Sequence, residues 1–367
     1  MCYLRLANIP ISSLIIISIR IHNPRKSHSN TIDMPGGDGT PGHIAKFIGA
    51  QLFGNTPKPT KSFAGQTVII TGSNTGLGFE GAKHAVKLGC AKLIIAVRSV
   101  EKGETAKRSI IQATGCEPKI IEVWSIDLTS YDSVKTFAER ADRELDRIDV
   151  LLENAAVASL EWNWVLDNER MVTVNVVSTF LLAFLMLPKL KATAAQFNTK
   201  PRLTFVTSDT HFLVDFNEKD APEGIFNRLN DKAKSMKNQS ERYPTTKLMQ
   251  VFIVREMAAH SYKESTPVII NCTNPGLCHS ELSRELDGMQ VWVAKFLLAR
   301  TSEEGSRNLI AGATGGLDTH GQYLDMGKVK TPATVVIGPG GAETQKRLYT
   351  ELIEKLERIV PGVSANL

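Results

Sequence analysis

The chain contains 367 residues, a length that at roughly 100–200 residues per domain corresponds to one large α/β domain or two smaller ones. With 42% hydrophobic and 22% charged residues it has the composition of a globular protein, which excludes a collagen-like, coiled-coil or wholly disordered chain. Most of the net charge of +5 lies near the N-terminus, because residues 1–60 hold six lysines and arginines but only two aspartates. The body is therefore nearly balanced in charge, and we expect no nucleic-acid partner.

The five cysteines are scattered along the chain and contain no Cys-x-x-Cys pair. An odd, scattered set argues against both a disulfide framework and a zinc site, so we expect no metal and a cytoplasmic, reducing location. Cys278 and His279 are adjacent, but neighbours in sequence rarely aim at one point. We do not interpret them as a ligand pair or a nucleophile.

The N-terminal region divides into two segments ahead of the main domain. Residues 1–40 are predicted to be a flexible extension with a short apolar run at residues 9–19, which is too short to span a bilayer. It could be a membrane-associating anchor, a signal peptide or an extension without a structural role, and we favour the last interpretation. Residues 41–61 follow as an amphipathic helix and linker, whose apolar side chains recur at helical spacing.

From residue 62 onward, short Val/Ile/Leu runs alternate with helical patterns. Predicted strands lie at residues 68–71, 93–97, 120–126, 150–152, 203–206 and 268–271, and residues 170–190 form one long buried helix with Pro188 at its end. Buried apolar strands separated by helices are typical of a parallel sheet covered on both faces. We therefore predict an α/β fold, a single doubly wound parallel sheet with helices on both faces, over residues 62–367.

A glycine-rich turn follows the first predicted strand. Residues 71–78 read Thr-Gly-Ser-Asn-Thr-Gly-Leu-Gly, and a predicted helix begins there. Three glycines allow a tight turn and close approach of the backbone to a ligand, while a helix N-terminus favours an anion. At the first strand-to-helix junction of a doubly wound sheet, this turn indicates a dinucleotide site.

These residues give the chain a resemblance to the short-chain dehydrogenase/reductase family, and within it to filamentous-fungal reductases of the retinol-dehydrogenase-like kind. The turn matches the family's Thr-Gly-x3-Gly-x-Gly, and Asp127-Leu128 matches its adenine-contacting pair. Residues 153–156 read Glu-Asn-Ala-Ala where the family usually has Asn-Asn-Ala-Gly, so Asn154 is kept but two positions differ. The resemblance covers residue 44 to the C-terminus and implies a Rossmann-type domain.

The sequence contains two Tyr-x3-Lys motifs, at Tyr131–Lys135 and Tyr243–Lys247. On a helix, both place a phenol beside an ammonium group. Only Tyr243 follows a strand whose end carries Ser208, at the carboxyl edge where the nicotinamide half of the crevice is expected. We predict that Tyr243 is catalytic and that Tyr131 is an ordinary surface tyrosine.

The chemistry of carbonyl reduction accounts for this trio. Hydride transfer leaves alkoxide character on the oxygen, so a proton donor must stand beside it, and we assign this role to Tyr243. The ammonium of Lys247 favours the phenolate, and Ser208 donates a hydrogen bond to the carbonyl oxygen. The resemblance adds that Lys247 binds the nicotinamide ribose and that Asn175 holds a water that relays protons to it. Alternatively, Asn175 bonds a backbone carbonyl, and Ser208 caps a turn while Thr207 takes its role.

Cofactor contacts are predicted at four places. The resemblance assigns the glycine turn, the adenine side and the turn after the strand at 268–271, with the residues Gly72, Ser73, Asn74, Gly76, Leu77, Gly78, Asp127, Leu128, Asn154, Pro275, Gly276, Leu277 and Ser280. The second strand ends at Arg98 with no acidic residue before it, and Lys102 lies four residues on. A guanidinium fork suits a phosphate, so these residues predict NADP rather than NAD.

We therefore expect an NADP-dependent carbonyl reductase or alcohol dehydrogenase. Aromatic and aliphatic residues in segments 209–242 and 281–300 favour a bulky, apolar ketone or alcohol, and the resemblance suggests a polyketide-like secondary metabolite. A retinoid, steroid or lipid dehydrogenase and a non-catalytic NADP-sensing protein are the alternatives. Homo-oligomer formation and membrane contact through residues 9–19 stay open.

Overall fold

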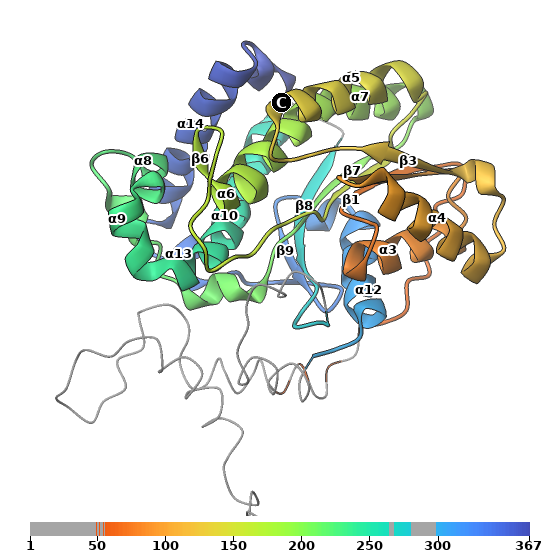
Figure 1. Ribbon diagram of the computed structural model, residues 1–367, viewed down its shortest axis with the longest axis horizontal. Helices are drawn as coiled ribbons and strands as arrows, with labels where there is room; N and C mark the ends of the chain where they lie inside the picture. The colour runs from red at the N-terminus through yellow and green to blue at the C-terminus, as the bar shows by residue number, and fades with distance from the viewer. Residues whose placement is uncertain (1–48, 50, 52–53, 55, 264–267, 280–298) are drawn as a thin grey trace, which may run out of the picture.

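In the computed structural model, the described residues are 49, 51, 54, 56–263, 268–279 and 299–367. Within them, eight strands form one central sheet in the order β10-β9-β8-β7-β4-β1-β2-β3 (Figure 1). The strands are β1 (Thr67–Thr71), β2 (Lys92–Val97), β3 (Ile121–Ser125), β4 (Val150–Glu153), β7 (Arg202–Val206), β8 (Ile269–Asn274), β9 (Tyr323–Asp325) and β10 (Lys328–Lys330). The predicted α/β fold is confirmed. The membrane alternatives for residues 9–19 and most of the predicted helix at 41–61 lie outside the described residues.

The sheet is parallel from β3 to β9, as predicted, but its last strand is not. β10 pairs antiparallel with β9, and the two are joined by Met326 and Gly327, which both have positive φ. A two-residue turn returns the chain directly alongside itself, so it can only build an antiparallel pair. The prediction of a parallel sheet is therefore wrong for the edge strand β10.

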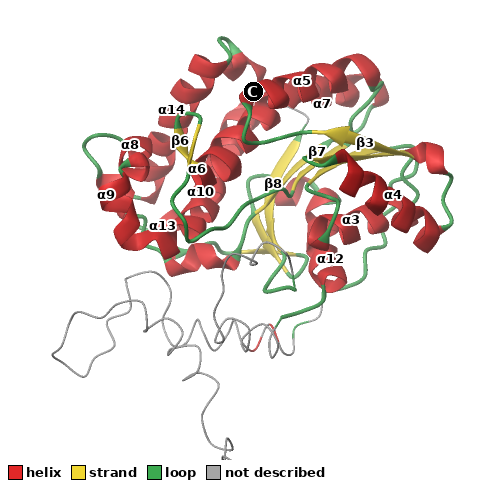
Figure 2. Cartoon of the chain, viewed as in Figure 1, coloured by secondary structure: helices red, strands yellow, loops and turns green. Residues whose placement is uncertain are grey.

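Helices cover both faces of the sheet (Figure 2). One layer contains α3 (Gly76–Lys87), α4 (Val100–Thr114) and α12 (Ser302–Ala313), and the other contains α5 (Tyr131–Glu144), α7 (Thr179–Phe197) and α10 (Arg242–Lys263). Strand side chains alternate between the layers: Val68 and Ile70 pack with the first, and Ile69 packs with the second. Burial on both faces explains why the strands are apolar throughout.

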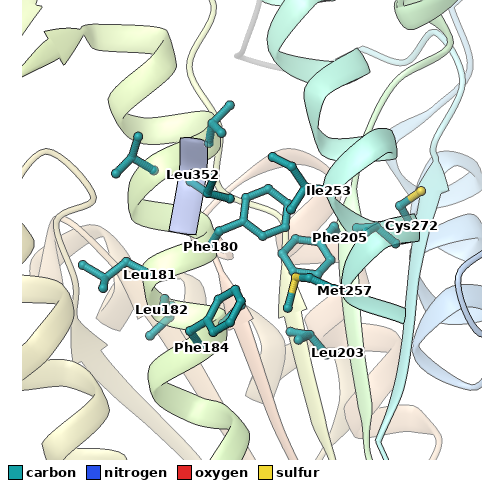
Figure 3. Close-up of a cluster of buried hydrophobic side chains, with 14 of the residues drawn as sticks. Phe180, Leu181, Leu182, Phe184, Leu203, Phe205, Ile253, Met257, Cys272 and Leu352 are labelled. Atoms are coloured by element: carbon teal, nitrogen blue, oxygen red, sulfur yellow. The ribbon is translucent and has the colours of Figure 1, made fainter. Parts of the chain in front are cut away.

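The larger core cluster lies between the sheet and the second layer (Figure 3). Phe180 of α7 stacks on Phe205 of β7, with ring centroids 4.7 Å apart. Leu352 of α14 (Gly341–Ile359) belongs to the same cluster, and α14 packs against α10. The C-terminal helix thus holds the outer side of the helix that carries the second Tyr-x3-Lys motif.

The long apolar helix differs from its prediction in where it ends. Residues 170–178 form α6 (Arg170–Val172) and a π-helical turn (Thr173–Ser178), and α7 then continues to Phe197, so Pro188 lies inside the helix. Proline cannot donate to the carbonyl four residues back, and the oxygen of Phe184 instead accepts from Asn366 Nδ2 at 3.1 Å. Among the described residues this is the one stretch apolar enough to span a membrane, but 89% of its most apolar window is buried in the protein, as in a core helix.

The segment between β7 and α10 contains short helices. They include α8 (Ile225–Asn230) and α9 (Lys232–Ser235), and α13 (Thr334–Ile337) follows β10. A separate hairpin of β5 (Trp164–Val165) and β6 (Asn168–Glu169) follows β4. The hairpin and the helices α8 and α9 follow the carboxyl ends of the parallel strands β4 and β7, which is where open α/β sheets bind their ligands.

Candidate active site

Ser208 and Tyr243 come from the adjoining ends of β7 and α10. Ser208 lies two residues after the end of β7, and its Oγ accepts from the backbone N–H of Thr210 at 3.2 Å, capping the turn Asp209–Leu213. Tyr243 lies in the first turn of α10, and a hydrogen bond with Ser208 favours its phenolate. The cap alternative for Ser208 is thus observed, and it leaves Ser208 beside Tyr243. Thr207 does not replace it, because its hydroxyl is buried and donates to the oxygen of Lys247 at 2.9 Å.

Lys247 lies one turn after Tyr243, with its ammonium 5.6 Å from the centre of the tyrosine ring. Its Nζ donates to the oxygen of Val206 at 2.7 Å and to Gln250 Oε1 at 3.1 Å. Burial disfavours the charged ammonium and lowers the pKa of Lys247 to about 7. The pKa of Tyr243 is raised, first by desolvation and then by the nearby Asp209 carboxylate. In this state the tyrosine is a phenol, ready to donate its proton.

Asn175 is buried in the π-helical turn, and its side chain bonds mostly backbone. Its Oδ1 accepts from the N–H of Val157 at 2.8 Å, and its Nδ2 donates to the oxygen of Val157 at 2.9 Å and to Thr246 Oγ1 at 3.1 Å. The connection to Lys247 runs through Gln250, whose Nε2 donates to the backbone oxygen of Asn175 at 2.7 Å. The backbone-bonding alternative is thus observed, and the water-relay role remains a prediction.

Tyr131 is not the ordinary surface tyrosine that we predicted. Its hydroxyl donates to Asp167 Oδ1 at 2.6 Å, and Lys355 Nζ donates to Asp167 Oδ2 at 2.8 Å. Tyr131 therefore links α5 to the β5–β6 hairpin and, through Asp167, to α14. Its motif partner Lys135 pairs with Asp132 at 2.7 Å instead. Tyr131 has a structural role because its hydroxyl binds Asp167 of the β5–β6 hairpin, which is remote from it in sequence.

The glycine turn has the close backbone approach that a dinucleotide phosphate requires. Gly72 and Gly76 have φ of +65° and +58°, a region that side chains disfavour. A Cβ on Gly78 would lie 2.5 Å from Asn154 Nδ2 and 2.6 Å from the oxygen of Gly72. The first residue before α3, Thr75, makes no side-chain cap, so the helix N-terminus is left to another acceptor. These observations fit a bound NAD(P) phosphate.

The other residues of the turn divide between structure and surface. Ser73 is buried and its hydroxyl donates to the oxygen of Ile70 at 2.7 Å. Leu77 is half-buried against the first-layer core, while Asn74 is partly exposed. Of these side chains, Asn74 is placed best to reach a ligand.

The adenine side and the end of β4 lie beside this turn. Asp127, after β3, accepts from the N–H and hydroxyl of Thr129 at 2.9 and 2.7 Å, and Leu128 is buried. Asn154 Nδ2 donates to the oxygen of Thr71 at 2.8 Å, which fixes the turn from below. Glu153 stands where the family usually has asparagine, and its carboxyl group accepts a hydrogen bond from the hydroxyl of Thr71 at 3.2 Å. Burial raises the pKa of Glu153 to about 8.

Arg98 and Lys102 lie where a cofactor's 2′ position was predicted. Arg98 directly follows β2 and is exposed, and Lys102 is exposed in the first turn of α4. Within the described residues, no hydrogen bond or ion pair occupies the guanidinium of Arg98, so it is free to meet a ligand. The turn Pro275–Leu277 follows β8, with Gly276 at φ +76°. Ser280, predicted to bind the nicotinamide amide, lies outside the described residues.

Three site residues were missed by the sequence analysis. Asn274 Oδ1 accepts from the N–H groups of Asp209 and Gly276 at 3.1 and 3.0 Å, so it joins the serine turn to the Pro-Gly turn. Gln250 links Lys247 to Asn175. Asp209 follows Ser208 and Asn274 precedes Pro275, so their position next to predicted site residues could have indicated them. Nothing in the sequence indicated Gln250.

Cys278 and His279 make no reactive pair. Burial raises the pKa of the Cys278 thiol to about 12, which keeps it protonated at neutral pH. Among the described residues, no three His, Cys, Asp or Glu side chains gather as a metal site requires.

The sheet, the glycine turn and the Ser208–Tyr243–Lys247 constellation define a dinucleotide-dependent oxidoreductase. Residues 66–209 match the short chain dehydrogenase family. The chain belongs to the short-chain dehydrogenase/reductase family, as the sequence resemblance indicated. It is 48% identical over 321 residues to the short chain dehydrogenase/reductase dmxR8 of Cryptosporiopsis sp. (strain 8999), covering 87% of this chain and 99% of that one.

Further relatives and solved structures agree. The short-chain dehydrogenase anuD of Penicillium roqueforti is 38% identical, with 86% of this chain and 84% of the relative covered. The Pseudomonas aeruginosa RhlG/NADP complex covers 72% of this chain and 95% of its own at TM-score 0.54 and 20% identity. The Brucella melitensis 3-ketoacyl-(acyl-carrier-protein) reductase, complexed with NADH, covers 72% and 97% at TM-score 0.53 and 18% identity. At such low identity these two structures show the shared fold alone.

Proposed function

We propose that this enzyme is an NADP-dependent carbonyl reductase, and in reverse an alcohol dehydrogenase, with Tyr243 as proton donor and acceptor. The observation that carries the proposal is the meeting of Ser208, Tyr243 and Lys247 at the carboxyl edge of the sheet, the edge at which the glycine turn after β1 also lies. A proton donor, a hydrogen-bond donor and a cation are what a developing alkoxide needs.

Residues of the protein carry out the proton transfer of the reaction. When bound, the nicotinamide supplies the hydride to the carbonyl carbon in reduction, or accepts it in oxidation. Ser208 donates a hydrogen bond to the carbonyl oxygen and orients it. Tyr243 gives that oxygen its proton, which completes the alcohol and leaves a phenolate that Lys247 stabilises. In oxidation the phenolate takes the proton back from the alcohol.

The preference for NADP is supported by charge at the end of β2. Arg98 is exposed there and Lys102 is exposed in the first turn of α4, and two cations suit a 2′-phosphate. No acidic side chain stands at the end of β2, where an NAD enzyme uses a carboxylate to bind the ribose hydroxyls. Glu101, the nearest acidic residue in sequence, is exposed on α4 beyond the turn.

A bulky, apolar substrate is supported by the segments that follow β4 and β7. Trp164 is 55% exposed, and four further large apolar side chains of these segments are also exposed: Leu160, Leu166, Leu213 and Met236. Large exposed apolar groups at the ligand-binding edge favour an apolar partner. Because fungal short-chain dehydrogenases such as dmxR8 are similar to this chain, we propose a polyketide-like aromatic ketone as the substrate class. The cytoplasm suits the free cysteines of the described chain.

The test is NADPH oxidation against a panel of aromatic polyketide ketones, with retinoid, steroid and lipid-like ketones as the comparison set. Fluorescence titration with NADPH measures binding separately from turnover. We expect turnover of an aromatic ketone and its loss in Tyr243→Phe. NADPH binding without turnover of any ketone would instead favour a cofactor-sensing protein.

A further inference from the structure

The segment that precedes β1 reaches the turn Pro275–Leu277, which is predicted to receive the nicotinamide end of the cofactor. Gln51 Nε2 donates to the backbone oxygen of Leu277 at 2.9 Å, although the two residues are 226 positions apart in the sequence. Only 8% of Gln51 is exposed, so its amide is buried against the turn. A residue ahead of the sheet therefore contacts the backbone of the predicted nicotinamide site.

Gln51 and Asn274 both fix the conformation of this turn. A Cβ on Gly276 would lie 2.8 Å from Gln51 Oε1, so the glutamine packs directly on the glycine, whose φ of +76° disfavours a side chain. The N–H of Gly276 donates to Asn274 Oδ1 at 3.0 Å, and the N–H of Asp209 donates to the same atom at 3.1 Å. Because Asp209 directly follows Ser208, the turn that the glutamine contacts is joined to the proposed catalytic serine.

Two arginines anchor this N-terminal segment. Arg300 Nη2 donates to the oxygen of Gly54 at 3.2 Å, and Arg307 Nη1 donates to the oxygen of Thr56 at 3.0 Å. The backbone N–H of Arg300 also donates to the oxygen of Leu277 at 2.9 Å, which has two lone pairs and can accept from the glutamine amide as well. Arg300 thus bonds both the segment and the turn, so the position of the segment does not depend on a single contact.

We propose that Gln51 is a positioning residue for the nicotinamide, because it holds the turn Pro275–Leu277 in the conformation that receives this group. The inference rests on the proposed NADP site. Binding to a turn that is already ordered costs less free energy, so losing the buried amide should weaken binding at this end of the cofactor. The adenosine end lies elsewhere, since Arg98 follows β2 and the turn follows β8. These strands are four positions apart in the sheet, about 19 Å at about 4.8 Å per strand.

The test is Gln51→Met in the full chain, because methionine is similar in length and keeps the packing but cannot donate to the oxygen of Leu277. Fluorescence titration gives the Kd of NADPH. Calorimetry gives the Kd of adenosine 2′,5′-bisphosphate, which has the adenosine end of the cofactor without the nicotinamide. We expect the Kd of NADPH to rise about three- to tenfold and that of the bisphosphate to stay within about twofold. Gln51→Ala is the second variant if methionine disturbs folding.

Lys61→Met is the matched control. Lys61 Nζ also bonds the N-terminal segment to a remote backbone oxygen, at 2.9 Å, but this oxygen belongs to Thr314 at the C-terminal end of α12. The substitution should leave both Kd values unchanged.

An unchanged Kd of NADPH in both Gln51 variants would overturn the inference. An equal loss of affinity for NADPH and for the bisphosphate would also overturn it, because it indicates a general loss of structure. An unmodified enzyme that binds NADPH but turns over no ketone would contradict the proposed function alone, since the two Kd values still decide the role of Gln51.

Discussion

Lys247 Nζ donates to the backbone oxygen of Val206 at 2.7 Å, so the helix that carries Tyr243 is tied to the strand that carries Ser208. Removing this lysine cuts a buried connection between α10 and β7 as well as a charge. Removing the hydroxyl of Tyr243 removes no positive charge and leaves this lysine connection in place, and it costs only the hydrogen bond with Ser208. The two residues should therefore fail in different ways when they are substituted.

Tyr243→Phe removes the proton donor and leaves the packing of α10 intact. We expect kcat to fall by about 10²–10⁴-fold, the usual contribution of a positioned acid, with nearly unchanged affinity for NADPH. Lys247→Ala should lose turnover and also weaken NADPH binding. Steady-state kinetics and fluorescence titration separate the two effects, and an active Tyr243→Phe enzyme would exclude the assigned role.

Tyr131→Phe tests the other Tyr-x3-Lys motif. We expect kcat and KM to stay within about twofold of the unmodified enzyme, because Tyr131 bonds Asp167 rather than any site residue. The free energy of unfolding should fall by about 1–3 kcal/mol, since Asp167 loses a donor. Chemical denaturation measures this loss. If Tyr131→Phe abolishes turnover, the choice between the two motifs is wrong.

The position of Ser208 next to Tyr243 was predictable because it depends on chain order alone. In a parallel sheet the carboxyl ends of the strands share one edge, so the strand before Tyr243 already places Ser208 beside it. The structural role of Tyr131 was not predictable, because Asp167 and Lys355 reach it from a hairpin and a C-terminal helix. Pro188 is a similar case, since Asn366 satisfies the carbonyl that the proline leaves free.

Gly78→Ala tests how closely the glycine turn approaches its surroundings. The new Cβ would lie 2.5 Å from Asn154 Nδ2, so the turn must shift. We expect a loss of about 1–3 kcal/mol in stability and at least a tenfold weaker Kd for NADPH. Gly81→Ala on the same helix is the control, because its nearest neighbour is 3.9 Å away. It should keep the Kd and raise Tm, as alanine favours the helix. Equal Kd values in both variants would contradict the predicted phosphate contact.

Glu153→Gln tests the buried carboxyl group under the glycine turn. The pKa of Glu153 is about 8 in the folded chain against an ordinary value of 4.5, so between these values the unfolded chain releases a proton that the folded chain keeps. Its contribution to stability therefore falls as pH rises through that window. The glutamine cannot ionise, so the stability of the variant does not fall in this way. Relative to the unmodified protein, its free energy of unfolding should therefore be higher at the alkaline end of the window than at the acid end by on the order of 1–3 kcal/mol.

Urea unfolding at the two ends of the window measures this gain. Glu122→Gln on β3 is the control, because Lys92 pairs with Glu122 at 2.8 Å and its pKa lies below the ordinary value. Once the pH is above the ordinary pKa of a glutamate, Glu122 is ionised in both states, so over that part of the window its substitution should change stability by a constant amount. A gain for Glu153→Gln that does not depend on pH would mean that this carboxyl group is already charged in the folded chain.

Arg98→Asp tests the cofactor preference. The substitution removes the guanidinium fork after β2 and puts a carboxylate where an NAD enzyme binds the ribose hydroxyls. Losing a charged hydrogen bond costs about 1.5–3 kcal/mol, so we expect the ratio of kcat/KM for NADPH to that for NADH to fall by about 10–100-fold. Arg108→Asp, exposed further along α4, makes the same change in net charge and should leave the ratio unchanged. Equal kcat/KM for the two cofactors in the unmodified enzyme would contradict the assignment of Arg98 to the 2′-phosphate.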